Sequence, residues 1–357
     1  MTIPLSWYSI AADPRFELPR DLRQRIGPAR SLPPGLARQE LIQEPWLPIP
    51  REVRERYAMW RPTPLRRATN LERSLHTRAR LFYKYEGGNL AGGQELNTAV
   101  AQAYYHRIAG AGSLTATTHT GRWGTAAAMA CQMFGLHCHV RLEQADTVDQ
   151  AQHRMLMELL GASVTSAEAD RAQEVAAEPT LYEGEPVSLP HQSVIGLEAF
   201  EQMRHRGALP GIVVAGSDFA GTVCPFLLAA SERKLPIRCV SVESAPGRSG
   251  LVSALRRRDL VDVVTYPRDE VFASLALFTR SEGILPALDS AFAVHGALVE
   301  AARADEEGAA PTILFSLSGH GLFELPAYRS YLDAHDPHGP WQGGMLHGDP
   351  HTLGQTS

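Results

Sequence analysis

Long apolar runs and clusters of basic residues are both missing from this sequence of 357 residues. No apolar run approaches the roughly 18 residues that a helix needs to cross a bilayer. The net charge of -5, without a Lys/Arg run, argues against a nucleic-acid surface. The first residues mix Asp13 and Glu17 with prolines, which is not the pattern of a signal peptide. We therefore expect a cytoplasmic globular protein that acts on a small molecule.

Cysteine and lysine are also scarce. The spacing of the four cysteines indicates neither a disulfide framework nor a metal site, so we expect reduced thiols and no metal: Cys131, Cys138, Cys224 and Cys239. Lys84 and Lys234 are the only lysines. A mechanism that needs a lysine imine therefore has two candidate residues.

What the sequence does contain is an alternation of short β-branched runs with longer helical patterns. Alternation of this kind predicts an α/β fold with parallel sheets flanked by helices. Ligands of such sheets bind at the carboxyl ends of the strands. The runs that predict strands are Leu81–Tyr85, Ser113–Thr117, Cys138–Leu142, Ser163–Thr165, Gly211–Ala215, Arg238–Glu243 and Thr312–Leu317.

The two ends of the chain have a different composition. Residues 1–60 are rich in proline and predict an extended arm with short helices around Arg20–Ile26 and Glu52–Trp60. Residues 336–357 are rich in Gly, Pro and His without periodicity, which predicts a flexible tail.

A series of motifs lies along these elements from residue 61 to about residue 332. The motifs are Arg61-Pro-Thr-Pro-Leu65, Tyr83-Lys-Tyr-Glu-Gly87, Asn97-Thr-Ala-Val-Ala-Gln-Ala-Tyr-Tyr105, Arg122-Trp-Gly-Thr125, Leu156-Met-Glu-Leu-Leu-Gly-Ala162, His191-Gln-Ser-Val-Ile-Gly-Leu-Glu198, Ser217-Asp-Phe-Ala-Gly221, Glu282-Gly-Ile-Leu-Pro286 and Leu317-Ser-Gly-His-Gly321. In this order they resemble the second, divergent group of tryptophan synthase β subunits.

The resemblance implies the two-domain fold type II of pyridoxal-phosphate enzymes, a homodimer, and a cofactor between the domains. We expect a larger domain from residues 61–92 and 205–335 and a smaller, mobile one from 93–204. The segments between Ala162 and His191 and between Ala245 and Leu260 are much shorter than the resemblance implies. Because the family uses these regions for its lid and partner surface, we expect no tryptophan synthase α subunit.

The residues that resemble the cofactor site depart from the family pattern. Where the family has its Schiff-base lysine and a neighbouring histidine, this chain has Glu95 and Gln94. The glycine-rich phosphate loop corresponds to Val214-Ala-Gly-Ser-Asp218, in which Asp218 would repel a phosphate. We therefore expect that pyridoxal phosphate is not used and that the chain has no cofactor.

Further departures lie in the family's Glu-Thr-Gly-Ala-Gly-Gln segment, which here starts at Thr117 and brings in His119 and Arg122. We predict Glu95 as the principal acid/base, because burial would raise the pKa of its carboxyl, with His119 assisting it. Arg122 would orient a substrate carboxylate. Gln94, Thr117, Asp218, Glu243 and Ser318 complete the predicted substrate site.

Each of these residues also has a structural explanation. Glu95 and Asp218 could cap helices, His119 could bond to backbone, Arg122 could form a salt bridge, and Ser318 could persist for packing.

Three functions remain open at this point. The first is cofactor-independent acid/base chemistry, namely cyclisation, isomerisation or carbon–carbon condensation of a small anionic or aromatic metabolite, in natural-product biosynthesis. The second is a lyase or synthase that binds pyridoxal phosphate non-covalently. The third is a non-catalytic regulatory subunit.

Overall fold

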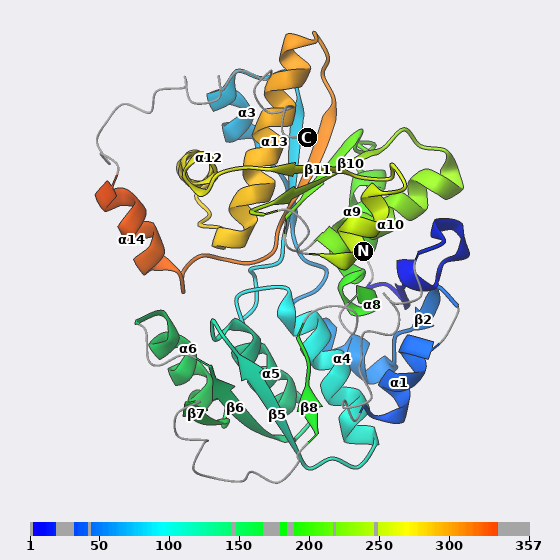
Figure 1. The fold of residues 1–357 in the computed structure, drawn as a ribbon, viewed down its shortest axis with the longest axis vertical. Coiled ribbons are helices and arrows are strands. Elements are labelled where there is room, and N and C mark those ends of the chain that lie inside the picture. The colour runs from blue at the N-terminus through cyan, green and yellow to red at the C-terminus, as the bar shows by residue number, and fades with distance from the viewer. Residues whose placement is uncertain are drawn as a thin grey trace.

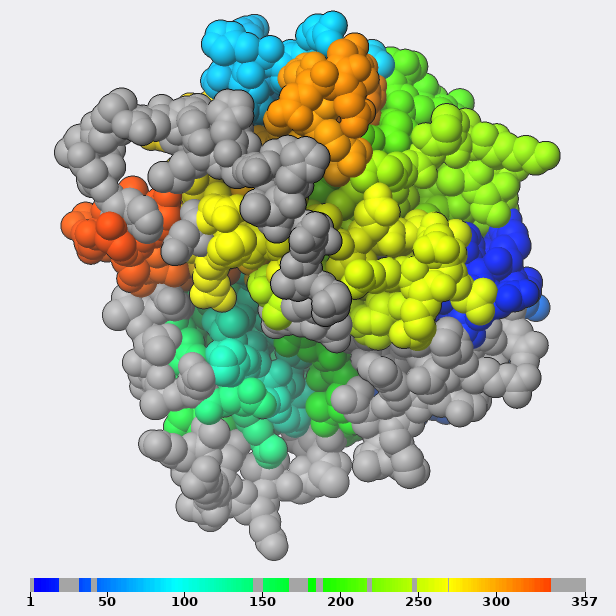
Figure 2. Space-filling model, turned by 45° about the horizontal axis from the view of Figure 1, so that its top comes forward, coloured from blue at the N-terminus to red at the C-terminus, as the bar shows by residue number. Residues whose placement is uncertain are grey.

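A computed structural model describes residues 3–18, 32–41, 44–143, 148–166, 179–183, 189–216, 219–245 and 249–334. Two main sheets divide this part of the chain, with the larger sheet at the top of Figure 1 and the smaller one below it. In Figure 2, the yellow residues around α12 lie above the teal residues of the smaller sheet's elements. The α/β fold with parallel sheets flanked by helices is confirmed.

The larger sheet has the strand order β11-β10-β9-β12-β4-β3, and only β3 runs antiparallel to its neighbour. Its central strands are buried on both faces because successive side chains alternate between two cores. Val213 and Leu314 face the core formed with α9, α10 and α11, whereas Val214 and Phe315 face α12 and α13. The strands are β3 (Leu65–Arg67), β4 (Arg80–Tyr85), β9 (Ile212–Ala215), β10 (Arg238–Glu243), β11 (Asp262–Thr265) and β12 (Thr312–Leu317).

The helices that belong to the larger sheet pack on both of its faces. They are α3 (Thr69–Leu75), α9 (Val194–His205), α10 (Phe219–Arg233), α11 (Gly250–Arg256), α12 (Arg268–Glu282) and α13 (Leu288–Glu306). Two further helices lie outside these layers: α8 (Leu189–Gln192) contacts α10, α4 (Glu95–Ile108) and β1 (Ser6–Tyr8), and α14 (Leu325–Ala334) contacts α6 (Val148–Leu159). None of the helices in the described ranges is both long enough and apolar enough to pass through a membrane.

The smaller sheet is entirely parallel, in the order β7-β6-β5-β8. Its own core is rich in alanine on α4 and α5, and these small side chains allow the two helices to pack closely. The elements are α4 (Glu95–Ile108), β5 (Ser113–Thr118), α5 (Arg122–Met133), β6 (His137–Leu142), α6 (Val148–Leu159), β7 (Ser163–Ser166) and β8 (Thr180–Leu181).

The N-terminal arm forms a small antiparallel ribbon of β1 (Ser6–Tyr8) and β2 (Trp46–Pro48). Two short 3-10 helices, Ile10–Ala12 and Pro14–Phe16, follow β1. The arm also contains α1 (Pro34–Leu41) and α2 (Arg51–Tyr57), and α2 corresponds to the helix predicted near Glu52. The helix predicted at Arg20–Ile26 and the predicted tail, residues 336–357, lie outside the described residues. The predicted domain limits stay a prediction.

A network of fully buried charges lies where the two sheets meet. The Arg61 guanidinium donates to Glu86 on one side and to Glu198 on the other, each at 2.8 Å. Lys84 Nζ donates to the second oxygen of Glu198 at 2.9 Å. Arg61 also donates to Asn97 Oδ1 of α4 at 2.8 Å, so the network joins β4, α9 and α4.

Replacing one member of this network leaves the remaining charges without a partner. We expect Glu198→Gln to lower the free energy of unfolding by about 3–5 kcal/mol, because Arg61 and Lys84 would stay charged and buried. Glu201 is on the same helix, where it forms an exposed ion pair with Arg204, so Glu201→Gln should cost about 1 kcal/mol or less. Urea unfolding of both variants tests this prediction. Equal losses would show that the buried network contributes no more than a surface pair.

Candidate functional site

Two loops at the carboxyl edge of the larger sheet are joined by backbone hydrogen bonds. Gln94 N–H donates to the Ser318 carbonyl and His320 N–H donates to the Gly92 carbonyl, both at 2.9 Å. Gly92 has a φ of +82°, a conformation that favours glycine. These bonds place the first residue of α4, Glu95, beside the end of β12. The site is therefore built where the sheet topology predicts a ligand.

Glu95 lies at this junction with its carboxyl turned inward. Only 15% of the side chain is exposed, and Oε2 is buried without a hydrogen-bond partner in the described part of the chain. Its Oε1 lies 3.5 Å from Arg122 Nη1. Burial raises the pKa of Glu95 above its usual range, and the positive charge of Arg122 opposes that rise. Glu95 is thus a carboxyl that exchanges a proton more readily near neutrality than an exposed one.

Arg122, the first residue of α5, links the two sheets through a second carboxylate. Its Nη2 donates to Glu324 Oε1, and Glu324 Oε2 accepts from the backbone N–H of Leu288 at 2.6 Å. Leu288 begins α13, so Glu324 caps that helix where its own N-cap residue, Ala287, offers no side-chain bond. Burial would lower the pKa of Arg122, but Glu95 and Glu324 hold it raised, and the guanidinium stays charged.

Two histidines lie near this chain of charges. His153 Nδ1 is 2.8 Å from Thr125 Oγ1, and its ring packs on Phe323 at 4.3 Å, as does His320 at 4.8 Å. Burial lowers the pKa of His153 to about 4, and burial together with the Arg122 charge lowers the pKa of His320. His153 is therefore neutral at pH 7 and suits packing better than proton donation.

The structure brings some of the predicted site residues together. Gln94, Glu95, Arg122 and Ser318 meet at one place, where Ser318 Oγ is 3.0 Å from Ser290 Oγ. The Oε1 of Gln94 is buried and has no partner among the described residues.

Other predicted residues lie apart from this group or beyond the described ranges. Thr117 and His119 are exposed at the end of β5, and His119 Nδ1 is 3.6 Å from Glu143. No hydrogen bond or ion pair connects His119 with Glu95 in the ranges that the structure covers. Glu243 is buried at the end of β10, and Asp218 lies outside the described residues.

The prediction from the sequence did not include two carboxyl groups of the site, those of Glu324 and Glu183. Glu324 is 202 residues from its partner Arg122, and no periodicity connects them. Glu183 follows β8 and keeps solvent contact, yet its pKa is raised to about 7, first by desolvation and then by the negative charge of Glu95. The only sequence signal is that Glu324 closely follows the Gly-His-Gly motif. The site thus holds more acidic groups than the sequence predicted.

The fold and the site together are those of an α/β enzyme whose site lies at the carboxyl ends of the strands, between two sheets. A family model described as pyridoxal-phosphate-dependent enzyme matches residues 58–319, and the chain belongs to this family. It is 32% identical to the tryptophan synthase beta chain 2 of Aeropyrum pernix, over 93% of both chains. The corresponding protein of Aquifex aeolicus is 34% identical, over 84% of this chain and 88% of its own. That of Thermotoga maritima is 32% identical, over 91% and 97%.

The expectation that the chain has no cofactor is wrong. The matched family is pyridoxal-phosphate-dependent, which indicates pyridoxal phosphate as the cofactor. The expectation rested on Glu95 in place of a lysine and on the changed phosphate loop that ends at Asp218, which lies outside the described residues. Non-covalent contacts do not need a lysine, and the Ser318 hydroxyl just after β12 is a polar group able to make one.

The raised pKa of Glu183 predicts a pH-dependent stability. The pKa of about 7 lies above the ordinary value of 4.5. The favourable contribution of the Glu183 carboxyl to the free energy of unfolding is therefore complete below about pH 4.5 and is lost as the pH rises through about 7. Glu183→Gln stays neutral, so it should be more stable than the parent chain at pH 8 and similar at pH 4.5. Urea midpoints at both pH values measure this, with the exposed Glu55→Gln as control. The same gain in both variants would contradict the prediction.

Proposed function

We propose that the chain is a lyase or synthase acting on a small amino acid, with pyridoxal phosphate held without a covalent bond to lysine. The match to the family over residues 58–319 supports the cofactor. Residue 95 at the start of α4 is a glutamate, and a carboxylate cannot form an imine. Lys84 donates to Thr63, Gln202 and Glu198 in the buried network, away from the site, and Lys234 follows the far end of α10.

The residues present fit a non-covalently held cofactor and an amine. Two buried oxygens, Gln94 Oε1 and Glu95 Oε2, have no partner in the described part of the chain, so a ligand N–H donor has acceptors waiting there. Ser318, which follows β12, would contact the cofactor ring. When bound, the cofactor withdraws electrons from the carbon next to the substrate amine.

The observation that carries this proposal is the position of the Glu95 carboxyl. It is buried at the helix start, next to the positive charge of Arg122 and beside Ser318. In our proposal Glu95 Oε2 takes a proton from the substrate carbon and later returns it. Burial raises the pKa of the Glu95 carboxyl and favours its protonated form, while the positive charge of Arg122 favours its ionised form.

Arg122 and Glu324 set the position of Glu95 in this scheme. Arg122 already contacts both carboxylates, so a substrate carboxylate that binds to it would compete with Glu324. Glu324 is held in turn by the N-terminus of α13. Arg122 is therefore held between Glu95 and Glu324 before a substrate carboxylate binds, and it stays next to Glu95 when that carboxylate replaces Glu324.

The finer expectations from the sequence stay predictions for this site. Cyclisation, isomerisation or carbon–carbon condensation as the reaction type stays such a prediction. Roles of His119, Thr117, Asp218 and Glu243 in substrate binding also stay predictions. So do the homodimer, the absence of an α-subunit partner and a natural-product pathway. The alignment with the Aeropyrum protein spans 419 positions, more than the 357 residues of this chain, so it contains gaps in this chain. These gaps support the prediction that the chain lacks segments that the resemblance implies.

Exchange of the α-hydrogen of amino acids tests the acid/base role of Glu95. In D2O with pyridoxal phosphate and a panel of small amino acids, the chain should exchange this hydrogen for at least one of them, as read by NMR. Glu95→Gln should slow the exchange by about 10²–10⁴-fold, because Gln cannot take the proton.

Glu201→Gln, which removes an exposed carboxyl far from the site, is the matched control and should exchange at the rate of the parent chain. Undiminished exchange in Glu95→Gln would refute the assignment of the base. Exchange by none of the proteins above the rate of free cofactor would refute the proposed function itself.

A further inference from the structure

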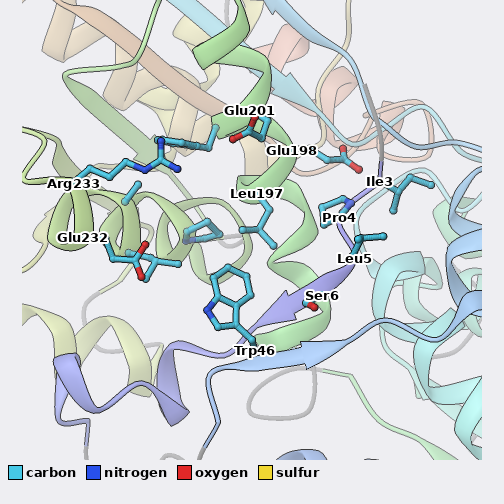
Figure 3. Close-up of a pocket in the computed structure, with 14 residues that line it drawn as sticks. Ile3, Pro4, Leu5, Ser6, Trp46, Leu197, Glu198, Glu201, Glu232 and Arg233 are labelled. Carbon is cyan, nitrogen blue, oxygen red and sulfur yellow. The ribbon is translucent and has the colours of Figure 1, made fainter.

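A cavity of about 450 Å³ lies on the outer side of the larger sheet, away from the candidate site. It is formed where the N-terminal arm crosses α9 and α10, and Figure 3 shows the lining side chains around its opening. Cavities of roughly 300–1,000 Å³ accommodate small molecules. The cavity is separate from the candidate site, because none of Glu95, Arg122, Glu324 and Ser318 lines it. Its charged edge is at Arg233, the last residue of α10.

The walls of this cavity are mostly apolar. Leu197 and Phe200 of α9 and Leu228 of α10 form its inner wall. Trp46 of β2 and Leu5 of the arm close it from outside, and they are 41% and 69% exposed. Two large apolar side chains that remain exposed on the rim of one cavity indicate a surface that a ligand would bury.

The carboxylates at this cavity already have partners. Glu232 pairs with Arg15 at 2.6 Å, and Glu201 pairs with Arg204 at 2.7 Å. Glu198 directs its side chain into the buried charge network. None of these three groups is left to attract a cationic ligand.

Arg233 differs from these groups. Its guanidinium lies over the ring of Phe200 at 4.9 Å, and no hydrogen bond or ion pair reaches it within the described ranges. Its charge helps to lower the pKa of the Glu201 carboxyl, but Arg204 is the hydrogen-bonded partner of Glu201 and contributes more. Stacking on an aromatic ring holds the planar fork of an arginine in a defined orientation and leaves its N–H edge for acceptors. An oxygen acid is the group that matches this edge in charge and geometry.

We propose that this cavity binds a small apolar carboxylic acid. Its aromatic or branched body would pack between Trp46 and the wall of Leu197 and Leu228, and its carboxylate would accept from Arg233. This inference goes beyond the proposed function and does not rest on it, since no residue of the cavity belongs to the candidate site.

Ligand-observed NMR of the full chain with 3-phenylpropionate tests the proposal. We expect saturable binding, and at least about tenfold weaker binding of 3-phenylpropionamide, which lacks the charge. Arg233→Gln should weaken binding of the acid at least about tenfold, and Trp46→Ala should weaken both probes because it removes a wall. Arg257→Gln, an exposed arginine of the same charge elsewhere on the surface, should bind like the parent chain.

Absence of saturable binding, equal binding of acid and amide, or unchanged binding in Arg233→Gln would each overturn the proposal. The urea midpoint of Arg233→Gln should match the parent chain, because its side chain is exposed and holds no ion pair. This binding experiment does not use α-hydrogen exchange at the candidate site. The cavity proposal can therefore fail while the proposed function stands, and the reverse is also true.

Discussion

The buried pairing of Arg61 and Lys84 with Glu86 and Glu198 is the interaction on which the rest of the structure depends. Two cations and two carboxylates in a nearly dry space tolerate little displacement, because each loses its partner if it moves. Through Asn97 the network fixes α4, and α4 carries Glu95 at its first residue. The carboxyl proposed as the acid/base is thus positioned by charges that never contact a substrate.

The proposed acid/base group of this site is a carboxyl and not an amine. A lysine can both form an imine and carry a proton, whereas Glu95 can only carry the proton. The positive charge of Arg122 lies between the carboxylates of Glu95 and Glu324, and Glu324 in turn accepts from the first backbone N–H of α13. These alternating charges join elements of the two sheets.

The sequence predicted the regular part of this molecule well. β10 and β12 have the predicted limits, because both are short runs rich in β-branched and other apolar residues that are buried in the sheet. β3 escaped prediction since three residues in a proline-rich stretch carry no pattern. At the site, the meeting of Glu95 and Arg122 followed from the topology, but the Glu324 contact depends on a loop far along the chain. The inference that no cofactor is used failed because the matched family depends on pyridoxal phosphate. Departures from a motif at Glu95 and Asp218 were not sufficient to exclude the cofactor.

The central claim is that the chain holds pyridoxal phosphate without a covalent bond. Native mass spectrometry followed by borohydride reduction and intact mass measurement tests it most directly. The account predicts one cofactor per chain in the native spectrum, no mass added to the unfolded chain after reduction, and a covalent addition only when Glu95→Lys restores a lysine at the start of α4. Covalent labelling of the parent chain, or a native spectrum without bound cofactor at saturating concentration, would contradict it.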